Sequence, residues 1–209
     1  MLALRLRPLS LICVTALLSA CAATSPGERY TPPPAGTTFL STAQSTGSYG
    51  NGPSEIPGLI VQADWKGTRV TGFQTPQNTI LVMDNGGFVA MLAPDGKPIN
   101  TWDPPLVWEF PLEVGKTWTK KYTITMSAQN TQIPFEVRQT VEAYENLVLP
   151  AGTFKSYRVR TSDTLGNENV HWFSPEAGVF VKASLRRTDK SAQGAGTRES
   201  ELKSTNLKR

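Results

Sequence analysis

Apolar and polar residues alternate along most of the chain from residue 59 onward, and this period of two limits the fold more than any other feature. The alternation is clearest around residues 59–66, 118–126, 135–143 and 179–186. Successive side chains of a strand point to opposite faces, so each segment would have one dry and one wet face. No long stretch shows the apolar spacing of an amphipathic helix. The pattern predicts an antiparallel all-β domain, either a β-sandwich or a partly open β-barrel.

Turn residues separate the predicted strands. Asp84-Asn85-Gly86-Gly87 lies between the apolar segments 79–83 and 88–92, and an Asn-Gly pair tolerates the positive φ angles of tight hairpins. Near the end of the chain, the segment 197–204 alternates charged residues with others. Its charges suit an edge strand that must not recruit neighbouring chains.

The N-terminus has the layout of a secretory signal. Arg5 and Arg7 precede an apolar run of about ten residues, which is far shorter than the roughly 20 residues of a membrane-spanning helix. The run ends in Leu18-Ser19-Ala20-Cys21, which resembles the lipobox of bacterial lipoproteins. The resemblance implies that residues 1–20 form a signal peptide and that Cys21 becomes acylated, with chains such as palmitate.

The residue after the cysteine bears on location. In Gram-negative lipoproteins an aspartate there resembles an inner-membrane retention signal, and this chain has Ala22 instead. The resemblance therefore implies a protein held at the outer membrane by its lipid and facing the periplasm. The alternative is an ordinary secretory signal with a chance cysteine.

Maturation would change the composition. It would remove Cys13 and leave Cys21 as the sole cysteine, so we expect no disulfide. Loss of Arg5 and Arg7 would leave 19 basic and 17 acidic residues. A net charge this small argues against a nucleic-acid partner.

The mature chain divides into three predicted parts. Residues 21–57 are rich in Pro, Ser, Thr, Gly and Gln, and they predict a flexible linker that lifts the domain from the membrane. The alternative is that residues 38–40 add an edge strand to the domain. We expect the β-domain over residues 58–205 and a C-terminal tail over residues 206–209.

Three further segments, 110–118, 149–154 and 172–182, contain the patterns Pro-Leu-x-Val-Gly, Pro-Ala-Gly-x-Phe and Trp-Phe-x-Pro. Together, over about residues 107–202, they resemble a loose group of uncharacterised bacterial periplasmic proteins and lipoproteins built from all-β domains. The resemblance implies a fold and a compartment. It brings no activity and no catalytic residues.

Two sets of residues are candidates for ligand contact. Four basic side chains would share an outward face if their strands pair, and could meet anionic lipid headgroups or an acidic polymer; they are Arg158, Arg160, Lys182 and Arg186. The alternative is an ordinary solvated face balanced by Glu136 and Glu142. Four tryptophans are candidates for an apolar or sugar-like ligand; they are Trp65, Trp102, Trp108 and Trp172.

Catalytic patterns are absent from the sequence. His171 is the only histidine and has only Glu168 nearby, so we expect neither a metal nor another cofactor. No Gly-x-Ser-x-Gly elbow and no P-loop occurs. The sequence therefore favours a non-enzymatic envelope module that binds a lipid, a glycan or a protein. One alternative is a carrier of a lipid or other apolar ligand inside a β-barrel, and a weaker one is a polysaccharide hydrolase, which would need converging carboxylates.

Overall fold

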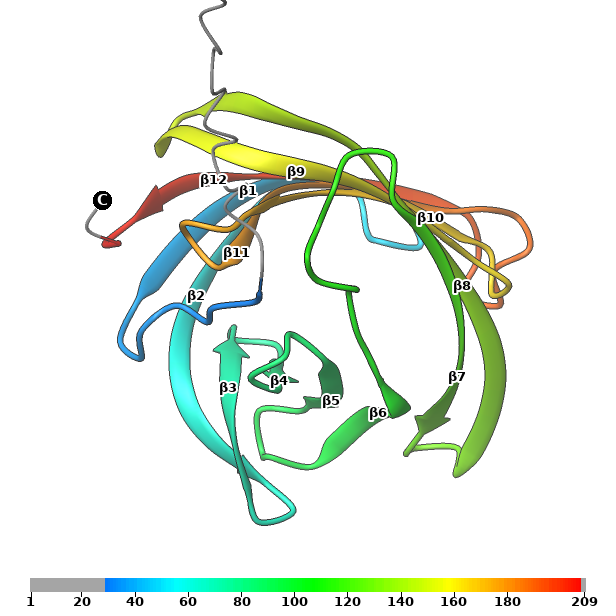
Figure 1. The fold of residues 1–209 in the computed structure, drawn as a ribbon. Helices are drawn as coiled ribbons and strands as arrows, with labels where there is room; N and C mark the ends of the chain where they lie inside the picture. The colour runs from blue at the N-terminus through cyan, green and yellow to red at the C-terminus, as the bar shows by residue number, and fades with distance from the viewer. Residues whose placement is uncertain (1–28, 208–209) are drawn as a thin grey trace, which may run out of the picture.

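The computed structural model describes residues 29–207 and consists of twelve antiparallel strands joined into one closed barrel (Figure 1). The strands are β1 (Thr38–Gly47), β2 (Gly52–Trp65), β3 (Thr68–Gln74), β4 (Thr79–Val82), β5 (Phe88–Leu92), β6 (Pro98–Leu106), β7 (Thr117–Met126), β8 (Thr131–Leu149), β9 (Gly152–Asp163), β10 (Asn167–Ser174), β11 (Val179–Arg187) and β12 (Gly196–Thr205).

Each strand pairs with its neighbours in chain order, and β12 then pairs with β1 to close the ring. Glu201 on β12 lies opposite Thr42 on one side and Lys182 on the other. The predicted all-β antiparallel fold is confirmed, with the barrel as the correct alternative. The barrel is closed rather than partly open, because the predicted edge strand near the C-terminus is paired on both sides.

Closure changes the expected boundary between linker and domain. The segment 38–57, expected to lie in the linker, forms β1 and the first part of β2. The segment forms strands although it has few large apolar residues, because the side chains that it buries, such as those of Ala43 and Ser45, are small. The expected linker over 21–57 is corrected accordingly, whereas the signal peptide and Cys21 lie outside the described residues.

The described part of the predicted C-terminal tail is attached to the barrel. The Asn206 side chain accepts a hydrogen bond from the Thr38 backbone N–H at 2.8 Å and donates one to the Gly36 carbonyl at 3.3 Å. The seam between the first and last strands is therefore continued by one residue beyond β12.

Buried side chains form four clusters among the described residues, and two of them lie next to the site described below. One fills the interior and is largely aromatic; it comprises Tyr30, Val82, Trp108, Leu112, Trp118, Val141, Tyr157, Val159 and Phe173. The other lies under the tip of the β8–β9 hairpin, where Leu149 and Phe154 join Val179, Val181 and Leu202. A backbone hydrogen bond from Ala151 to Leu202, at 3.4 Å, fixes this tip to β12.

Between residues 29 and 207, no helix has the length and apolar character needed to cross a membrane.

Candidate ligand pocket

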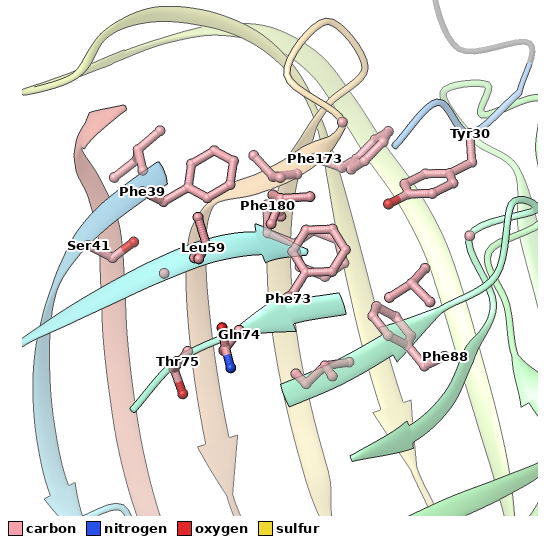
Figure 2. Close-up of a pocket in the computed structure, with 18 of the residues that line it drawn as sticks. Tyr30, Phe39, Ser41, Leu59, Phe73, Gln74, Thr75, Phe88, Phe173 and Phe180 are labelled. Atoms are coloured by element: carbon pink, nitrogen blue, oxygen red, sulfur yellow. The ribbon is translucent and has the colours of Figure 1, made fainter. Parts of the chain in front are cut away.

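A cavity of about 220 Å³ lies toward the end of the barrel where β1 and β11 begin and β10 and β12 end, and residues from the end of β3 and the start of β4 also line it. We call this end the pocket end and the cavity the pocket. Figure 2 shows the pocket between β2 and β3 on one side and Tyr30 and Phe88 on the other. Six phenylalanines line it; they are Phe39, Phe73, Phe88, Phe110, Phe173 and Phe180.

The pocket is apolar and uncharged. None of the described residues that line it carries a charge. Its polar side chains include Ser41, Gln74 and Thr75, which lie away from Tyr30 and Phe88 in Figure 2. A lining of apolar groups with a few polar ones is typical of small-molecule sites.

Phe180 shows that the pocket is open rather than filled by the protein's own side chains. Its ring centroid lies 4.8 Å from that of His171, 5.0 Å from that of Trp108 and 6.2 Å from that of Phe88. Despite these neighbours, 37% of Phe180 remains exposed. A large aromatic side chain surrounded by aromatic rings keeps that exposure only where the space beside it is empty.

The N-terminal segment forms part of the pocket wall. The Tyr30 ring packs against those of Phe110 and Phe173, both at 6.2 Å between centroids. Two turns make room for this segment by having glycine. A Cβ on Gly86 would lie 3.1 Å from the Tyr30 ring, and one on Gly178 would collide with the carbonyl of Thr31.

Two polar groups near the pocket are buried without a partner among the described residues. They are the Tyr30 hydroxyl and Nδ1 of His171. Burial, assisted by the nearby Asp84, raises the pKa of Tyr30. Burial also lowers the pKa of His171 to about 4, so the imidazole is neutral at neutral pH. His171 packs edge-on to Trp108 and close to Phe180.

The four candidate tryptophans are not brought together. Trp108 lines the pocket. Trp65 packs on a separate cluster around Leu81, and Trp102 packs near Tyr122. Trp102 lies within β6 and is half-buried.

The four basic candidates do share one face of the sheet, which we call the charged face. The register sets Arg158 opposite Trp172, and Trp172 opposite Lys182. Because His171 and Phe173 point to the interior aromatic cluster, Trp172 points outward. Its Nε1 donates to Glu145 at 2.9 Å, and Nζ of Lys182 lies 5.3 Å from its ring centroid.

Carboxylates neutralise most of the charged face. Arg158 pairs with Glu142 at 3.1 Å and with Glu145 at 3.3 Å. Arg160 also pairs with Glu142, at 2.5 Å. Arg186 pairs with Glu168 at 2.5 Å. An anionic ligand would therefore have to displace these carboxylates.

The opposite end of the barrel, which we call the far end, is built differently. It consists of the β1–β2 turn and the β11–β12 loop, and two arginines meet there over the Tyr49 ring, with guanidinium carbons 4.0 Å (Arg187) and 5.2 Å (Arg198) from its centroid. Arg198 donates to Ser45 Oγ and to the Tyr49 carbonyl, both at 2.9 Å. Arg187 donates to the Ser48 carbonyl at 3.1 Å. These contacts tie the two loops together.

The described part of the chain has no metal-binding cluster. No group of three or more His, Cys, Asp or Glu residues in 29–207 could hold a metal ion. His171 contacts aromatic rings, and none of the residues that line the pocket is a carboxylate. The hydroxyl groups among the described lining residues belong to Tyr30, Ser41 and Thr75.

Some of the pocket residues that sequence reasoning missed come from the expected linker; they are Tyr30, Phe39, Ser41 and Ile56. Tyr30 and Phe39 lie in that segment, and both line the pocket. The available signal was the presence of isolated aromatic residues in an otherwise polar stretch, since such residues are costly to leave in water.

The chain is similar in structure to exported proteins and lipoproteins. No protein-family model matches it, and no curated protein matches it in sequence. A predicted exported protein with a YmcC-like fold from Bacteroides fragilis is 11% identical, with a TM-score of 0.46 over 86% of this chain and 100% of that one. A predicted lipoprotein from Parabacteroides distasonis is 11% identical, with a TM-score of 0.43 over 85% of this chain and 99% of that one.

A third similar structure is the hypothetical lipoprotein YmcC from Escherichia coli. It is 14% identical, with a TM-score of 0.44 over 82% of this chain and 88% of that one. At such identities, and with TM-scores below 0.5, these likenesses assign neither a family nor a function to this chain.

Proposed function

We propose that this protein is a lipid-anchored envelope protein that binds an apolar ligand, such as an acyl chain, in the pocket, without catalysing a reaction on it. The observation that carries the proposal is the open, uncharged pocket of about 220 Å³ with its aromatic wall. A carrier needs an empty apolar space inside its barrel, and that space is present.

The free energy of methylene burial and the volume of the pocket together restrict the size and shape of the ligand. Each buried methylene contributes about 0.8 kcal/mol, and a Kd of 1 μM requires about 8 kcal/mol, so roughly ten methylenes must leave water. A cavity of about 150 Å³ holds one benzene, and the pocket is not much larger. Part of such a chain would therefore extend past Phe39 and Leu59 at the opening. A long, flexible chain fits this better than a compact ring system.

Other readings have less support from the structure. The charged face is already paired with carboxylates, which weakens the case for an anionic polymer. A hydrolase would need carboxylates that converge on the substrate, and the pocket has none. Anchoring through Cys21 in the outer membrane, facing the periplasm, belongs to the proposal and rests on the sequence.

Fluorescent probe binding tests the pocket. The mature chain with Cys21→Ser cannot be acylated, so it can be titrated with N-phenyl-1-naphthylamine without detergent. Gly58 lines the pocket, and a Cβ there would meet only ordinary contacts, 3.7–3.9 Å from its nearest neighbours. Gly58→Val should therefore fill space without distorting the strand and weaken probe binding at least tenfold.

The control is Thr119→Val, which places the same residue at an exposed position of β7 outside the pocket. It should bind the probe like the parent chain, and both variants should keep the parent's thermal midpoint. If the parent chain shows no saturable binding, or if Gly58→Val binds equally well, the pocket is not a ligand site.

A further inference from the structure

We infer that the pocket end faces the membrane that holds the lipid anchor, and that the ligand is an acyl chain taken directly from that bilayer. This inference rests on the proposed function, because it assigns a source and a chemical class to the ligand of the same pocket. It also means that the surface around the pocket opening contacts a phospholipid bilayer.

The first observation is where the chain joins the barrel. Tyr30 is a wall of the pocket, and the residues after it are fixed beside the opening. The Thr37 hydroxyl donates to the Pro34 carbonyl at 2.6 Å. Backbone hydrogen bonds of 2.8 Å then link Gly36 to the Ile60 carbonyl and Ile60 to the Thr37 carbonyl. The N-terminal segment thus enters the fold at the pocket end.

The second observation is the length of chain before that point. Tyr30 follows Cys21 by nine residues, which span at most about 30 Å at roughly 3.3–3.6 Å per residue. β1 then runs for ten residues away from the pocket end, about 30 Å at roughly 3.3 Å per residue. The anchor therefore holds the pocket end close to the bilayer and leaves the far end a further strand length away.

The third observation is the chemistry of the opening. Leu59 is 37% exposed there, beside Phe39 and Ile56, and Ser41 and Gln74 supply neutral polar groups. Exposed apolar side chains are favourable where they can enter a lipid surface.

Depth-dependent quenching on the intact lipoprotein tests the orientation. Acylated Cys21 has no free thiol, so a single new cysteine can be labelled. Glu176→Cys lies in the β10–β11 turn at the pocket end, and Gln193→Cys lies in the β11–β12 loop at the far end; both are exposed turn residues outside the pocket lining. Each is labelled with an NBD fluorophore and reconstituted in phosphatidylcholine vesicles with 20 mol% phosphatidylglycerol and headgroup-region spin-labelled lipid.

We expect at least twofold stronger quenching at position 176 than at position 193. Equal quenching, or stronger quenching at position 193, overturns the orientation. That result leaves probe binding to the pocket untouched, so failure of this inference can be told apart from failure of the proposed function.

The source of the ligand is tested with the same vesicles made from phospholipids with deuterated acyl chains. After incubation, the lipoprotein is extracted and analysed by native mass spectrometry. We expect a bound species with the deuterated mass, reduced at least tenfold by Gly58→Val and unchanged by Thr119→Val. A ligand of unlabelled mass only, or no ligand on a protein that still binds N-phenyl-1-naphthylamine, overturns the bilayer as the source.

Discussion

The two ends of the barrel differ in the kind of side chain that they use, polar at the far end and apolar at the pocket end. At the far end, Arg187 and Arg198 stack on Tyr49 and donate to carbonyl and hydroxyl oxygens of the neighbouring loop, so polar groups are used within the protein. At the pocket end, Phe180 and Leu59 remain over a third exposed. At the far end, hydrogen-bonding groups are paired within the protein. At the pocket end, exposed apolar side chains would still gain free energy by being buried. Contacts within the protein therefore stabilise the far end, whereas the pocket end keeps the exposed apolar surface that the proposed function uses.

The largest effect on the free energy of unfolding is expected at the pocket end, where a buried and a partly exposed phenylalanine can be compared. Phe173 is 3% exposed and contacts Tyr30, Trp108 and Phe110. Phe173→Ala should lower the free energy of unfolding by about 3–5 kcal/mol, the usual cost of truncating a buried phenylalanine. Phe180→Ala should cost only about 1–2 kcal/mol, because less surface is lost. Urea denaturation of both variants would contradict this division if the two costs were equal.

The next effect is a loss of folding stability at acidic pH. Burial lowers the folded-state pKa of His171 to about 4 from 6.5. Between these values the unfolded chain takes up a proton that the folded chain excludes, so stability is full above pH 6.5 and falls as the pH drops toward 4. The loss should reach about 2–3 kcal/mol.

The measurement is urea denaturation at pH 7 and pH 4.5, with His171→Phe as the control for all other titrating groups. The parent chain should lose more stability than His171→Phe over this interval. Parallel losses would mean that His171 titrates normally, and the pocket end would then be wetter than the structure shows.

The far end offers a stability effect without a binding effect. Arg198→Ala removes two hydrogen bonds from a guanidinium and its contact with Tyr49, and should cost about 2 kcal/mol. Binding of N-phenyl-1-naphthylamine, measured where the variant is still folded, should match that of the parent chain. A large loss of affinity would break the distinction between the two ends.

The smallest effect is expected on the charged face, which belongs to neither end. Glu142→Gln removes ion pairs to Arg158 and Arg160, both of which keep partly exposed side chains. Screening by solvent limits the cost to about 0.5–1 kcal/mol. The arginines hold the pKa of Glu142 below its ordinary value. The difference between parent and variant should therefore begin to shrink as the pH falls below the pKa of a free carboxyl group, and should vanish below the lowered pKa of Glu142 in the folded chain. Thermal midpoints of parent and variant in low and high salt would check the screening, and the same midpoints at decreasing pH would check the pH dependence.

Much of the fold follows from the period-two pattern. The Asp84–Gly87 turn lies between β4 and β5 as predicted, and the basic residues share a face because strand side chains alternate strictly. The closure of the barrel could not be predicted in the same way. β1 buries Ala43 and Ser45, which resemble linker residues in composition, so pairing on both sides decides its structure rather than hydrophobicity.

The pocket was harder to predict than the fold. Its walls come from many separate strands and from the N-terminal segment, so no single stretch of sequence contains it. Trp108 alone among the four tryptophans lies there, and nothing in its local sequence distinguishes it from Trp102. Which face of a strand borders empty space depends on how the whole ring closes.

The seam between β1 and β12 also has a consequence for the order of assembly. Thr42 pairs with Glu201, and Gly47 with Gly196, so these contacts join residues at nearly opposite ends of the chain. Contacts of such high sequence separation form late, since a long loop must close before they are made. Leu202, a wall of the pocket, arrives with the same strand. A chain that is cut short before β12 therefore has neither a closed ring nor a complete pocket, so the proposed ligand binding requires fully synthesised copies.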